Sequence, residues 1–464
     1  MTLRVQLPLS YANERHYVLS VVLREHLGLD FVTESRECPS VVISSSAVGR
    51  LVLDDTFFST PVDRWLTAQS LPRQPLDTLD LSALPIKPDI VQPEIPVIYG
   101  TRLENNAYVE FRESLVRLGV DVFGSAFFVL SRYEEFVSLE RDEHLRFPAM
   151  ASLHTQEGFL ERPIIDEYVQ VLWCCLKKLW PRLVAKARSF QTFLTHDVDM
   201  PFCAAGQPVL QVAKATVGDV VKRRRPDLAV SRFRAFTMGL LGNVESDPCN
   251  TFDWLMDVSE EMNIRSIFYF IARNSGGDVK RYHLDHPRIR KLLRRIHERG
   301  HEIGLHPSYN SFRNRMQIKH EFHNLLRVCA EEGISQANWG GRQHYLQWEC
   351  PTTWRHYEEA GLTYDSTLGY ADRIGFRCGT CTEYPTYDLQ TRHQLRLRER
   401  PLTVMEASLL SDKYMGLEVE AAMARNDQIK LACRTVNGNY VLLWHNSELI
   451  TKQLRDAFIR SVTD

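Results

Sequence analysis

Residues 300–310 read GHEIGLHPSYN, in which a short apolar run ends at His306 and is followed at once by a proline. A short apolar run between turn signals is typical of a buried strand. The preceding residues carry the signals of a helix, with Pro287 in the first turn and Gly300 as a stop. Its apolar stripe consists of Ile289, Leu292, Leu293 and Ile296. This stretch therefore predicts a helix followed by a strand that ends in a histidine.

The same alternation of strand and helix continues from about Ser189 to the end of the chain. Strand-like runs occupy residues 190–194, 264–272, 301–306 and 440–445, and helical spacing recurs over 318–329. Strands that alternate with helices are typical of a parallel sheet. We therefore predict an α/β fold in which residues 187–464 form a (β/α) barrel.

Residues 1–186 have a different character and predict a smaller α+β or α/β domain. Short strand and helix signals are separated there by proline-rich connections. The segment 71–100 holds many of the prolines and predicts an extended surface excursion. Apolar spacing predicts helices over 108–119 and 124–136. No residue pattern in this domain indicates its role.

Composition limits the classes of protein that the chain can represent. With 464 residues, of which 44% are hydrophobic and 25% charged, it is an ordinary globular protein. A formal charge of −2 provides no general field for nucleic acid, so we expect no nucleic-acid partner. No signal peptide and no apolar run of the ~18 to 20 residues that a spanning helix needs is seen. We therefore expect a soluble, cytoplasmic protein.

The ten cysteines are expected to be reduced thiols, because no secretory signal accompanies them. Cys378 and Cys381 form a C-x-x-C pair, but no second pair or histidine pair follows them. This pair therefore predicts neither a structural zinc nor redox chemistry.

Polar residues follow four of the predicted strands, at the point where each strand ends. The segments are THDVD (195–199), HPSYN (306–310), GRQHY (341–345) and WHN (444–446). In a parallel barrel, catalytic groups lie at the carboxyl ends of the strands. Taken alone, the Asp-Val-Asp pair suits a solvated turn and His306 suits a buried core. Together, Asp199 and His306 supply a ligand pair suited to Zn, Mn, Co or Fe.

The order THDVD, GHEIGLHPSYNS, GGRQHYL and VLLWHNS resembles the polysaccharide deacetylase superfamily, carbohydrate esterase family four. The resemblance covers roughly Ser189 to Asp464 and implies a distorted (β/α) barrel with metal-dependent N-deacetylase activity. The amino half is similar to an unassigned domain that precedes this barrel in some bacterial members.

The resemblance also implies roles for individual residues. Asp197 matches the catalytic base, and Arg342 matches the arginine that orients it. Asp199 and His306 match metal ligands. His445 resembles the late histidine that protonates the leaving amine.

The chain departs from the family pattern at the second ligand histidine, where Asn310 stands. An amide oxygen is a weaker ligand for zinc, so Asn310 is expected to hold the metal loosely. Alternatively, His344 is the third ligand, or it binds substrate. Tyr345 and Trp339 either stack on a sugar ring or belong to the core. Glu406 is either an inward acid at the barrel mouth or a charge at a strand end.

Residues 214–234 hold seven basic residues against two acidic ones. A solvated helix face is the ordinary interpretation. The alternative is that this segment docks a phosphate-bearing substrate or makes a peripheral contact with an anionic membrane.

These observations predict a metal-dependent hydrolase of carbon–nitrogen (amide) bonds. The expected cofactor is a divalent metal, zinc before Co, Mn or Fe, and the expected activity is N-deacetylation of an N-acetylated sugar in bacterial surface-glycan metabolism. The sugar or glycan is free or linked to phosphate or lipid. The alternative is a non-catalytic glycan-binding or scaffold protein that lost a metal ligand at Asn310, and a third reading is an enzyme that acts on another bond, such as a cyclic amide.

Overall fold

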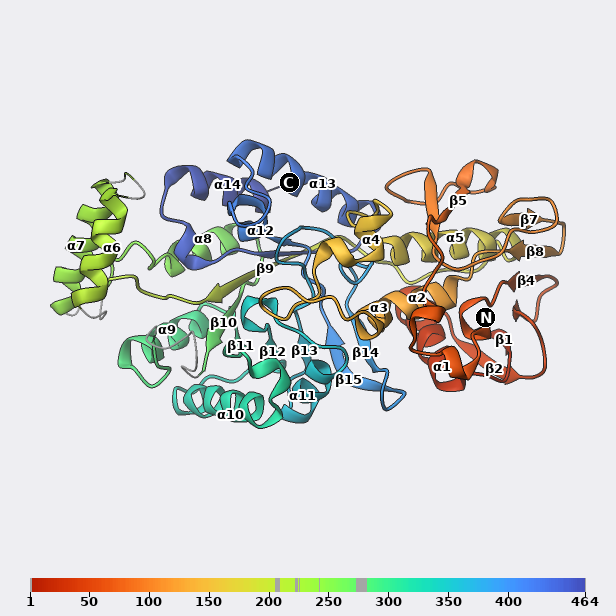
Figure 1. Ribbon diagram of the computed structural model, residues 1–464, viewed down its shortest axis with the longest axis horizontal. Coiled ribbons are helices and arrows are strands. Elements are labelled where there is room, and N and C mark those ends of the chain that lie inside the picture. Colours follow the sequence, from red (N-terminus) through yellow and green to blue (C-terminus); the bar gives the residue numbers. More distant parts are fainter. Residues whose placement is uncertain are drawn as a thin grey trace.

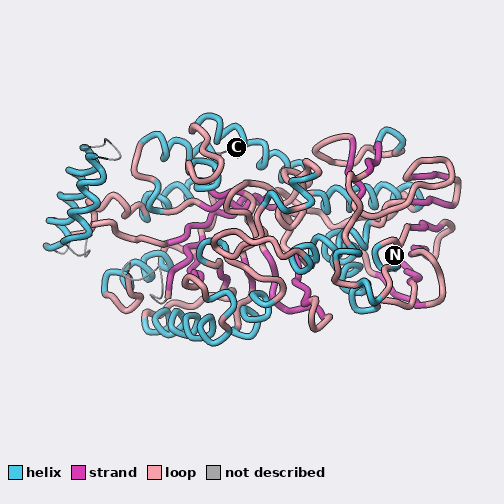
Figure 2. The backbone as a smooth tube through the Cα atoms, in the orientation of Figure 1, coloured by secondary structure: helices cyan, strands magenta, loops and turns pink. Residues whose placement is uncertain are grey.

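The computed structural model describes residues 2–204, 209–221, 224, 226–241, 243–272 and 282–463. Figure 1 shows an elongated molecule with the amino-terminal elements at one end and a large sheet in the middle. Two helices, α6 (Val209–Val221) and α7 (Pro226–Leu240), project together at the other end. The tube in Figure 2 separates the same three regions.

A mixed sheet forms the core of the amino-terminal domain, with the strand order β2-β1-β3-β4-β8-β7. Its strands are β1 (Leu3–Leu7), β2 (Phe31–Ser35), β3 (Val41–Ser44), β4 (Arg50–Leu53), β7 (Val109–Phe111) and β8 (Leu115–Leu118). The proline-rich segment contributes a small separate sheet, β5 (Asp77–Asp80) with β6 (Glu94–Val97). The helices are α1 (Ala12–Leu19), which continues as a π-helical segment (Ser20–His26), α2 (Val122–Leu130), α3 (Tyr133–Val137), α4 (Leu153–Gln156) and α5 (Ile164–Leu179).

The prediction of a helix over residues 108–119 is wrong, because this segment is the antiparallel hairpin of β7 and β8. Val116 and Leu118 are buried on the same face of β8, while Arg117 between them is not. Such alternation is the period of a strand, and the apolar spacing of a short hairpin can imitate a helix. The helix predicted over 124–136 is confirmed as α2 and α3, which are separated by Arg132 in a left-handed conformation.

A second sheet, with the order β14-β15-β13-β12-β11-β10-β9-β17-β16, forms the carboxyl-terminal domain. Among the described residues, its neighbouring strands run parallel except β14 and β15, which are antiparallel. Its strands are β9 (Gln191–Val198), β10 (Ile267–Ile271), β11 (Glu302–His306), β12 (Gly340–Gly341), β13 (Tyr364–Asp365), β14 (Tyr384–Asp388), β15 (His393–Glu399), β16 (Val404–Met405) and β17 (Asn439–Leu443). The proposed domain boundary near residue 187 lies between α5 and β9.

Amphipathic helices cover this sheet. They are α8 (Phe252–Glu261), α9 (Pro287–Glu298), α10 (Arg315–Glu331), α11 (Thr352–Ala360), α12 (Glu406–Leu410), α13 (Val419–Thr435) and α14 (Lys452–Val462). The apolar stripe expected before residue 300 is buried on α9, which confirms the helix and strand read from the sequence there. Within the described residues, no helix combines the length and apolar character needed to cross a membrane.

The α/β class is confirmed, but closure of the sheet into a barrel is not. In the described part of the chain, β14 and β16 are the two ends of the strand order and no pairing joins β15 to β16. Both edges of β15 are occupied, one by β13 and the other by β14. Closure would therefore have to join β14 to β16, and the described residues show no such pairing.

Two aromatic rings fill the inside of the sheet opposite glycines. A Cβ atom on Gly304 would lie 2.3 Å from the ring of Tyr269, and one on Gly340 would lie 1.9 Å from that of Tyr364. Both rings are buried. The guanidinium carbon of Arg342 lies 4.8 Å from the centroid of Tyr269. Because these glycines have no side chain, there is room for the rings of Tyr269 and Tyr364 against the strands. The Tyr269 ring in turn supports Arg342.

We expect Gly340→Ala to destabilise the protein by ~1–3 kcal/mol, because a buried ring has to move out of its packed position to admit the methyl group. The measurement is the midpoint of thermal or denaturant unfolding. Gly218→Ala is the matched control, since no atom lies within 4 Å of its added Cβ and Gly218 is helical. Equal midpoints for Gly340→Ala and the wild type would contradict this account of the packing.

Buried polar contacts join the two domains. Glu135 of α3 accepts hydrogen bonds from Arg377 at 2.8 and 2.7 Å and from Arg132 at 2.8 Å. Burial opposes ionisation of this carboxyl, but the two guanidinium groups lower the pKa of Glu135 to about 2. Asp166 of α5 accepts hydrogen bonds from residues 380–382. A buried charge is tolerated only when it is paired, so these contacts fix how the domains meet.

Candidate active site

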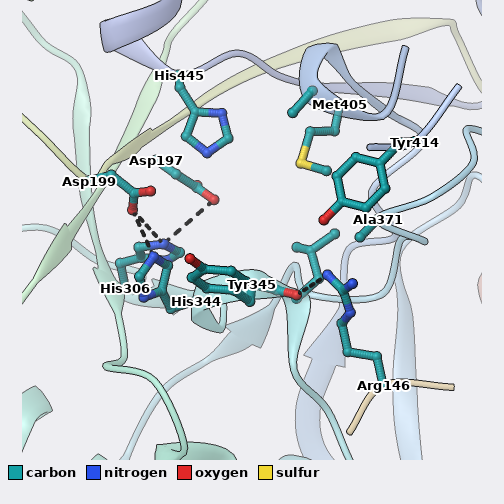
Figure 3. Close-up of a pocket in the computed structure, with 12 residues that line it drawn as sticks. Arg146, Asp197, Asp199, His306, His344, Tyr345, Ala371, Met405, Tyr414 and His445 are labelled. Atoms are coloured by element: carbon teal, nitrogen blue, oxygen red, sulfur yellow. Dashed lines mark hydrogen bonds and ion pairs between the residues drawn. The ribbon is translucent and has the colours of Figure 1, made fainter. Parts of the chain in front are cut away.

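A pocket lies at the carboxyl edge of the second sheet, where the ends of β9, β11, β12, β16 and β17 meet. Parallel strands all end at one edge, which is why residues from distant parts of the sequence converge there. Figure 3 shows the side chains pointing into this pocket. Its lining residues are Arg146, Asp197, Asp199, His306, His344, Tyr345, Leu346, Ala371, Met405, Ala407, Tyr414 and His445.

One carboxylate and two imidazoles converge at the base of the pocket. Oδ1 of Asp199 lies 3.3 Å from Nε2 of His306 and 3.3 Å from Nε2 of His344. Burial opposes ionisation of Asp199, but His344 and His306 together hold its pKa well below the usual value. The three side chains offer ligand atoms that all lie within 4.8 Å of one another. The Asp199 carboxylate is therefore kept ionised beside the Nε2 atoms of His306 and His344, which are potential metal ligands.

The orientation of His306 suits a metal ligand. Its Nδ1 lies 2.6 Å from the backbone carbonyl oxygen of Arg342. A carbonyl only accepts hydrogen bonds, so Nδ1 carries a proton and Nε2 is the ring nitrogen that faces Asp199. Metal-binding histidines commonly donate their other ring N–H in this way. A carboxylate with two imidazole nitrogens is a donor set that fits a divalent transition metal.

Asn310 does not join this cluster. It is exposed, has a left-handed conformation (φ 66°) and does not line the pocket. Its backbone N–H donates to Oε1 of Gln347 at 2.8 Å. In a helix, residues four apart are neighbours on one face, but residues 307–310 are not helical, so the spacing from His306 does not bring Asn310 to the site. The structure places His344 in the third position instead.

Arg342 holds Asp197 in a fixed orientation. Arg342 is fully buried, and its Nη1 donates to Oδ1 of Asp197 at 3.0 Å and to Oγ1 of Thr195 at 2.8 Å. Its Nε and Nη2 donate to the carbonyl and the hydroxyl of Ser366 at 2.9 and 3.0 Å. Oδ2 of Asp197 lies 3.8 Å from Nε2 of His306. The arginine thus leaves one carboxylate oxygen directed toward the ligand cluster.

His445 is paired with Glu406, for which the sequence left two interpretations open, an inward acid or a charge at a strand end. Nδ1 of His445 lies 2.5 Å from Oε1 of Glu406, and the His445 backbone N–H donates to the same oxygen at 3.1 Å. Burial lowers the pKa of His445, but the negative charge of Glu406 outweighs it and raises the pKa to about 10. Glu406 begins α12 directly after β16, which places it beside the end of β17. The imidazole is therefore kept protonated over the pocket.

The two aromatic candidates lie at opposite ends of β12. Tyr345 follows the strand, lines the pocket and is 40% exposed, and its ring packs against those of His144 and Tyr309. Trp339 precedes the strand and packs against Phe322 of α10. Since the pocket lies at the carboxyl edge, Tyr345 can contact a ligand there, whereas Trp339 is part of the packing at the other end.

The amino-terminal domain contributes a wall of the pocket that sequence reasoning missed. Nη1 of Arg146 donates to the backbone oxygen of Tyr345 at 2.9 Å, a contact drawn in Figure 3. The same guanidinium pairs with Asp142 at 2.7 Å. Tyr345 has a left-handed conformation (φ 61°), so this contact supports a strained turn at the mouth of the pocket. No sequence signal links residues so far apart in the chain.

A second group of potential ligands, Cys203, Asp247 and Cys249, is buried outside the pocket. The Asp247 carboxylate accepts backbone N–H groups from Cys203 at 3.0 Å, Ala204 at 2.9 Å and Cys249 at 3.0 Å. The Cys203 thiol and burial raise the pKa of Cys249 well above its usual value. This disfavours the thiolate that a metal binds. The carboxylate therefore joins two backbone segments at the base of α6 and α7.

All ten cysteines are free thiols, as expected. Those of the C-x-x-C pair, Cys378 and Cys381, are buried. Burial raises the pKa of Cys378 to about 12, so its thiol stays protonated.

Among known protein families, the amino-terminal domain matches one whose function is unknown. Residues 3–181 match DUF7033, a family of unknown function. No curated protein matches the chain.

Several solved structures are similar to this chain at low sequence identity. A protein from Mycobacterium smegmatis classed as a polysaccharide deacetylase is 16% identical, and the match covers 60% of this chain and 84% of that one with a TM-score of 0.39. A protein of the same class from Pseudomonas aeruginosa PAO1 is 14% identical over 59% of this chain and 83% of its own, with a TM-score of 0.35. The allantoinase PuuE is 12% identical over 59% and 82%, also with a TM-score of 0.35. These values assign no activity to this chain.

Proposed function

We propose that the protein is a metal-dependent hydrolase of carbon–nitrogen bonds that removes the acyl group from an N-acylated sugar. The observation that carries this proposal is the convergence of three functional units at one edge of the sheet. These are the ligand cluster of Asp199, His306 and His344, the oriented carboxylate of Asp197, and the protonated imidazole of His445. A site that only bound glycans would need neither the oriented carboxylate of Asp197 nor the protonated imidazole of His445.

The ligand cluster and Asp197 have different roles in the attack of water on the acyl carbonyl. A divalent ion held by Asp199, His306 and His344, zinc before Co, Mn or Fe, would polarise the acyl carbonyl and make a water molecule more acidic. Asp197 accepts the proton of the attacking water through the oxygen that Arg342 leaves free. Arg342 keeps the Asp197 carboxylate in place, since its three other hydrogen bonds are to Thr195 and Ser366.

His445 completes the reaction at the leaving group. Its Nδ1–H is held by Glu406, so Nε2 is the nitrogen directed into the pocket. From there it donates a proton to the departing sugar nitrogen, which would otherwise leave as an unstable anion. The exposed ring of Tyr345 at the mouth offers an apolar face to a sugar ring.

The proposal is tested by measuring acetate release together with metal content. Purified full-length protein is loaded with Zn, Co or Mn and offered N-acetylhexosamines, their nucleotide-linked forms and N-acetylated oligosaccharides, with Asp197→Asn as the blank. We expect turnover of at least one sugar class by the metal-loaded wild type alone. Turnover of cyclic amides with no release of acetate from any sugar would assign a different carbon–nitrogen bond. Binding of the metal with no hydrolysis of either class would contradict the proposal.

We expect Glu406→Gln to move the basic limb of the pH profile to lower pH by about 1 unit or more. Activity requires His445 to be protonated, and the Glu406 carboxylate stabilises the protonated form. A neutral glutamine removes that stabilisation, so the His445 pKa falls from its raised value and the acid is lost at lower pH. The measurement is kcat against pH.

Glu420→Gln is the matched control for this profile, because the Glu420 side chain is 85% exposed on α13 and forms a surface ion pair with Arg460 of α14. Its basic limb should coincide with that of the wild type. An unmoved limb in Glu406→Gln would exclude His445 as the acid.

A further inference from the structure

The helices α6 and α7 form a hairpin that projects from the body of the protein (Figures 1 and 2). The hairpin is held together by a buried ion pair between Nε of Arg232 and Oδ2 of Asp219 at 2.7 Å. Two contacts tie it to the body: Nη1 of Arg232 donates to the carbonyl of Cys203 at 3.2 Å, and Nη2 of Arg288 donates to that of Gly239 at 2.8 Å. The hairpin is thus a defined element with its outer side free of the sheet.

The outer side of this hairpin is apolar. Among the described residues, 23 large hydrophobic side chains are exposed, and nine of them lie between residues 209 and 241. We call six of these the apolar face: Leu210, Val217, Val221, Val230, Phe233 and Leu240. All six are at least 60% exposed.

The spacing of the apolar face follows the helical period. On α6 the exposed residues recur at intervals of seven and four, and on α7 at intervals of three and seven. An amphipathic helix of a globular protein normally turns such a stripe toward its core. Here the stripe is turned outward, and apolar surface gathered in this way marks a site of interaction.

The same hairpin is strongly basic within a chain of net charge −2. Between residues 209 and 241 the sequence has seven basic residues, Lys214, Lys222, Arg223, Arg224, Arg225, Arg232 and Arg234, against two acidic ones, Asp219 and Asp227. Lys214 and Arg234 are exposed beside the apolar face. The side chains of Lys222, Arg223 and Arg225, which belong to the basic segment singled out in the sequence, lie outside the described residues.

We propose that the α6–α7 hairpin docks on an anionic lipid bilayer, with the apolar face among the acyl chains and Lys214 and Arg234 at the headgroups. Helices that carry an apolar stripe beside Lys and Arg bind the membrane interface in this way. A second copy of the chain would match the apolar face, but two hairpins of the same positive charge repel each other. A nucleic acid would match the charge and leave the apolar face in water.

The test is co-sedimentation of the full chain with vesicles of phosphatidylcholine and phosphatidylglycerol in equal parts, compared with pure phosphatidylcholine. We expect binding to the anionic vesicles that weakens as salt is added. The triple variant Leu210→Gln, Phe233→Gln, Leu240→Gln should bind at least ~10-fold more weakly, because glutamine keeps the helix and removes buried apolar area.

Matched controls separate the hairpin from the general surface. Leu139→Gln, Val48→Gln and Val184→Gln together remove apolar side chains elsewhere that are even more exposed, and this variant should bind as the wild type does. Lys214→Glu with Arg234→Glu should abolish the preference for anionic vesicles, whereas Lys178→Glu with Lys319→Glu should keep it. The charge pair also tests the proposal if the glutamine variant does not fold.

Three results would overturn the proposal. They are a wild type that stays in the supernatant at low salt, hairpin variants that bind as the wild type does, and a lipid-free dimer that the glutamine variant abolishes. The last result, seen by sedimentation velocity, would assign the apolar face to a second copy of the chain. None of these readouts depends on hydrolase activity.

Discussion

Asp197→Asn is expected to abolish turnover while leaving the metal site intact. The amide cannot accept the proton of the attacking water, so kcat should fall by ~10²–10⁴-fold, the contribution typical of a general base. Its oxygen can still accept the hydrogen bond that Arg342 gives Oδ1 at 3.0 Å, so the fold around the site is kept. The measurement is kcat together with the metal content of the same preparation.

Asp412→Asn is the control for this change, because Asp412 is an exposed carboxylate just before Tyr414 that does not line the pocket. It should keep both metal and activity. If Asp197→Asn lost its metal, Asp197 would have to be counted among the ligands. If it kept most of its turnover, another group would be the base.

His344→Ala is expected to weaken binding of Zn or Co at least ~100-fold and to lose activity with it, whereas Asn310→Ala should bind the metal as the wild type does. Removing a ligand costs more than the 10–100-fold typical of groups that only support one. His344 directs Nε2 at Oδ1 of Asp199, and Asn310 is exposed outside the pocket. The two variants therefore decide between the two candidates for the third ligand.

The measurement for this pair is elemental mass spectrometry of dialysed protein, followed by titration with Co, whose absorption reports its coordination. His306→Ala serves as the reference for a lost ligand. Loss of metal from Asn310→Ala with retention in His344→Ala would restore the assignment made from the sequence motif. Equal metal content in all three variants would exclude the pocket as the metal site.

Four strands of the second sheet, β9, β10, β11 and β17, could be predicted because their signals are local. The run before His306, the helix before Gly300 and the run that ends at His445 each carry their own period and their own stop. Parallel strands then bring their carboxyl ends together, so four separate sequence segments predicted one pocket. In residues 108–119 the local signal was ambiguous, and pairing of β7 with β8 decided between strand and helix.

The closure of the sheet could not be read from alternation alone. Alternating strands and helices predict parallel pairing but not which strands stand at the edges. The antiparallel strand β14 covers the free edge of β15, so the described sheet ends at β14 and β16, which do not pair.

Local sequence signals predicted which residues stand at the ends of the strands. They thereby identified the candidate site residues, which are Asp197, Asp199, His306, Arg342 and His445. Tertiary structure alone decided which partners these residues meet. Glu406 supports His445, Arg146 supports the turn at Tyr345, and His344 replaces Asn310. The physical reason is that strand ends follow from local periodicity, whereas the partner of a side chain depends on the path of a turn and on segments distant in the chain. Residues 307–310 show this most directly, because a non-helical turn carries Asn310 away from the histidine that lies four residues before it.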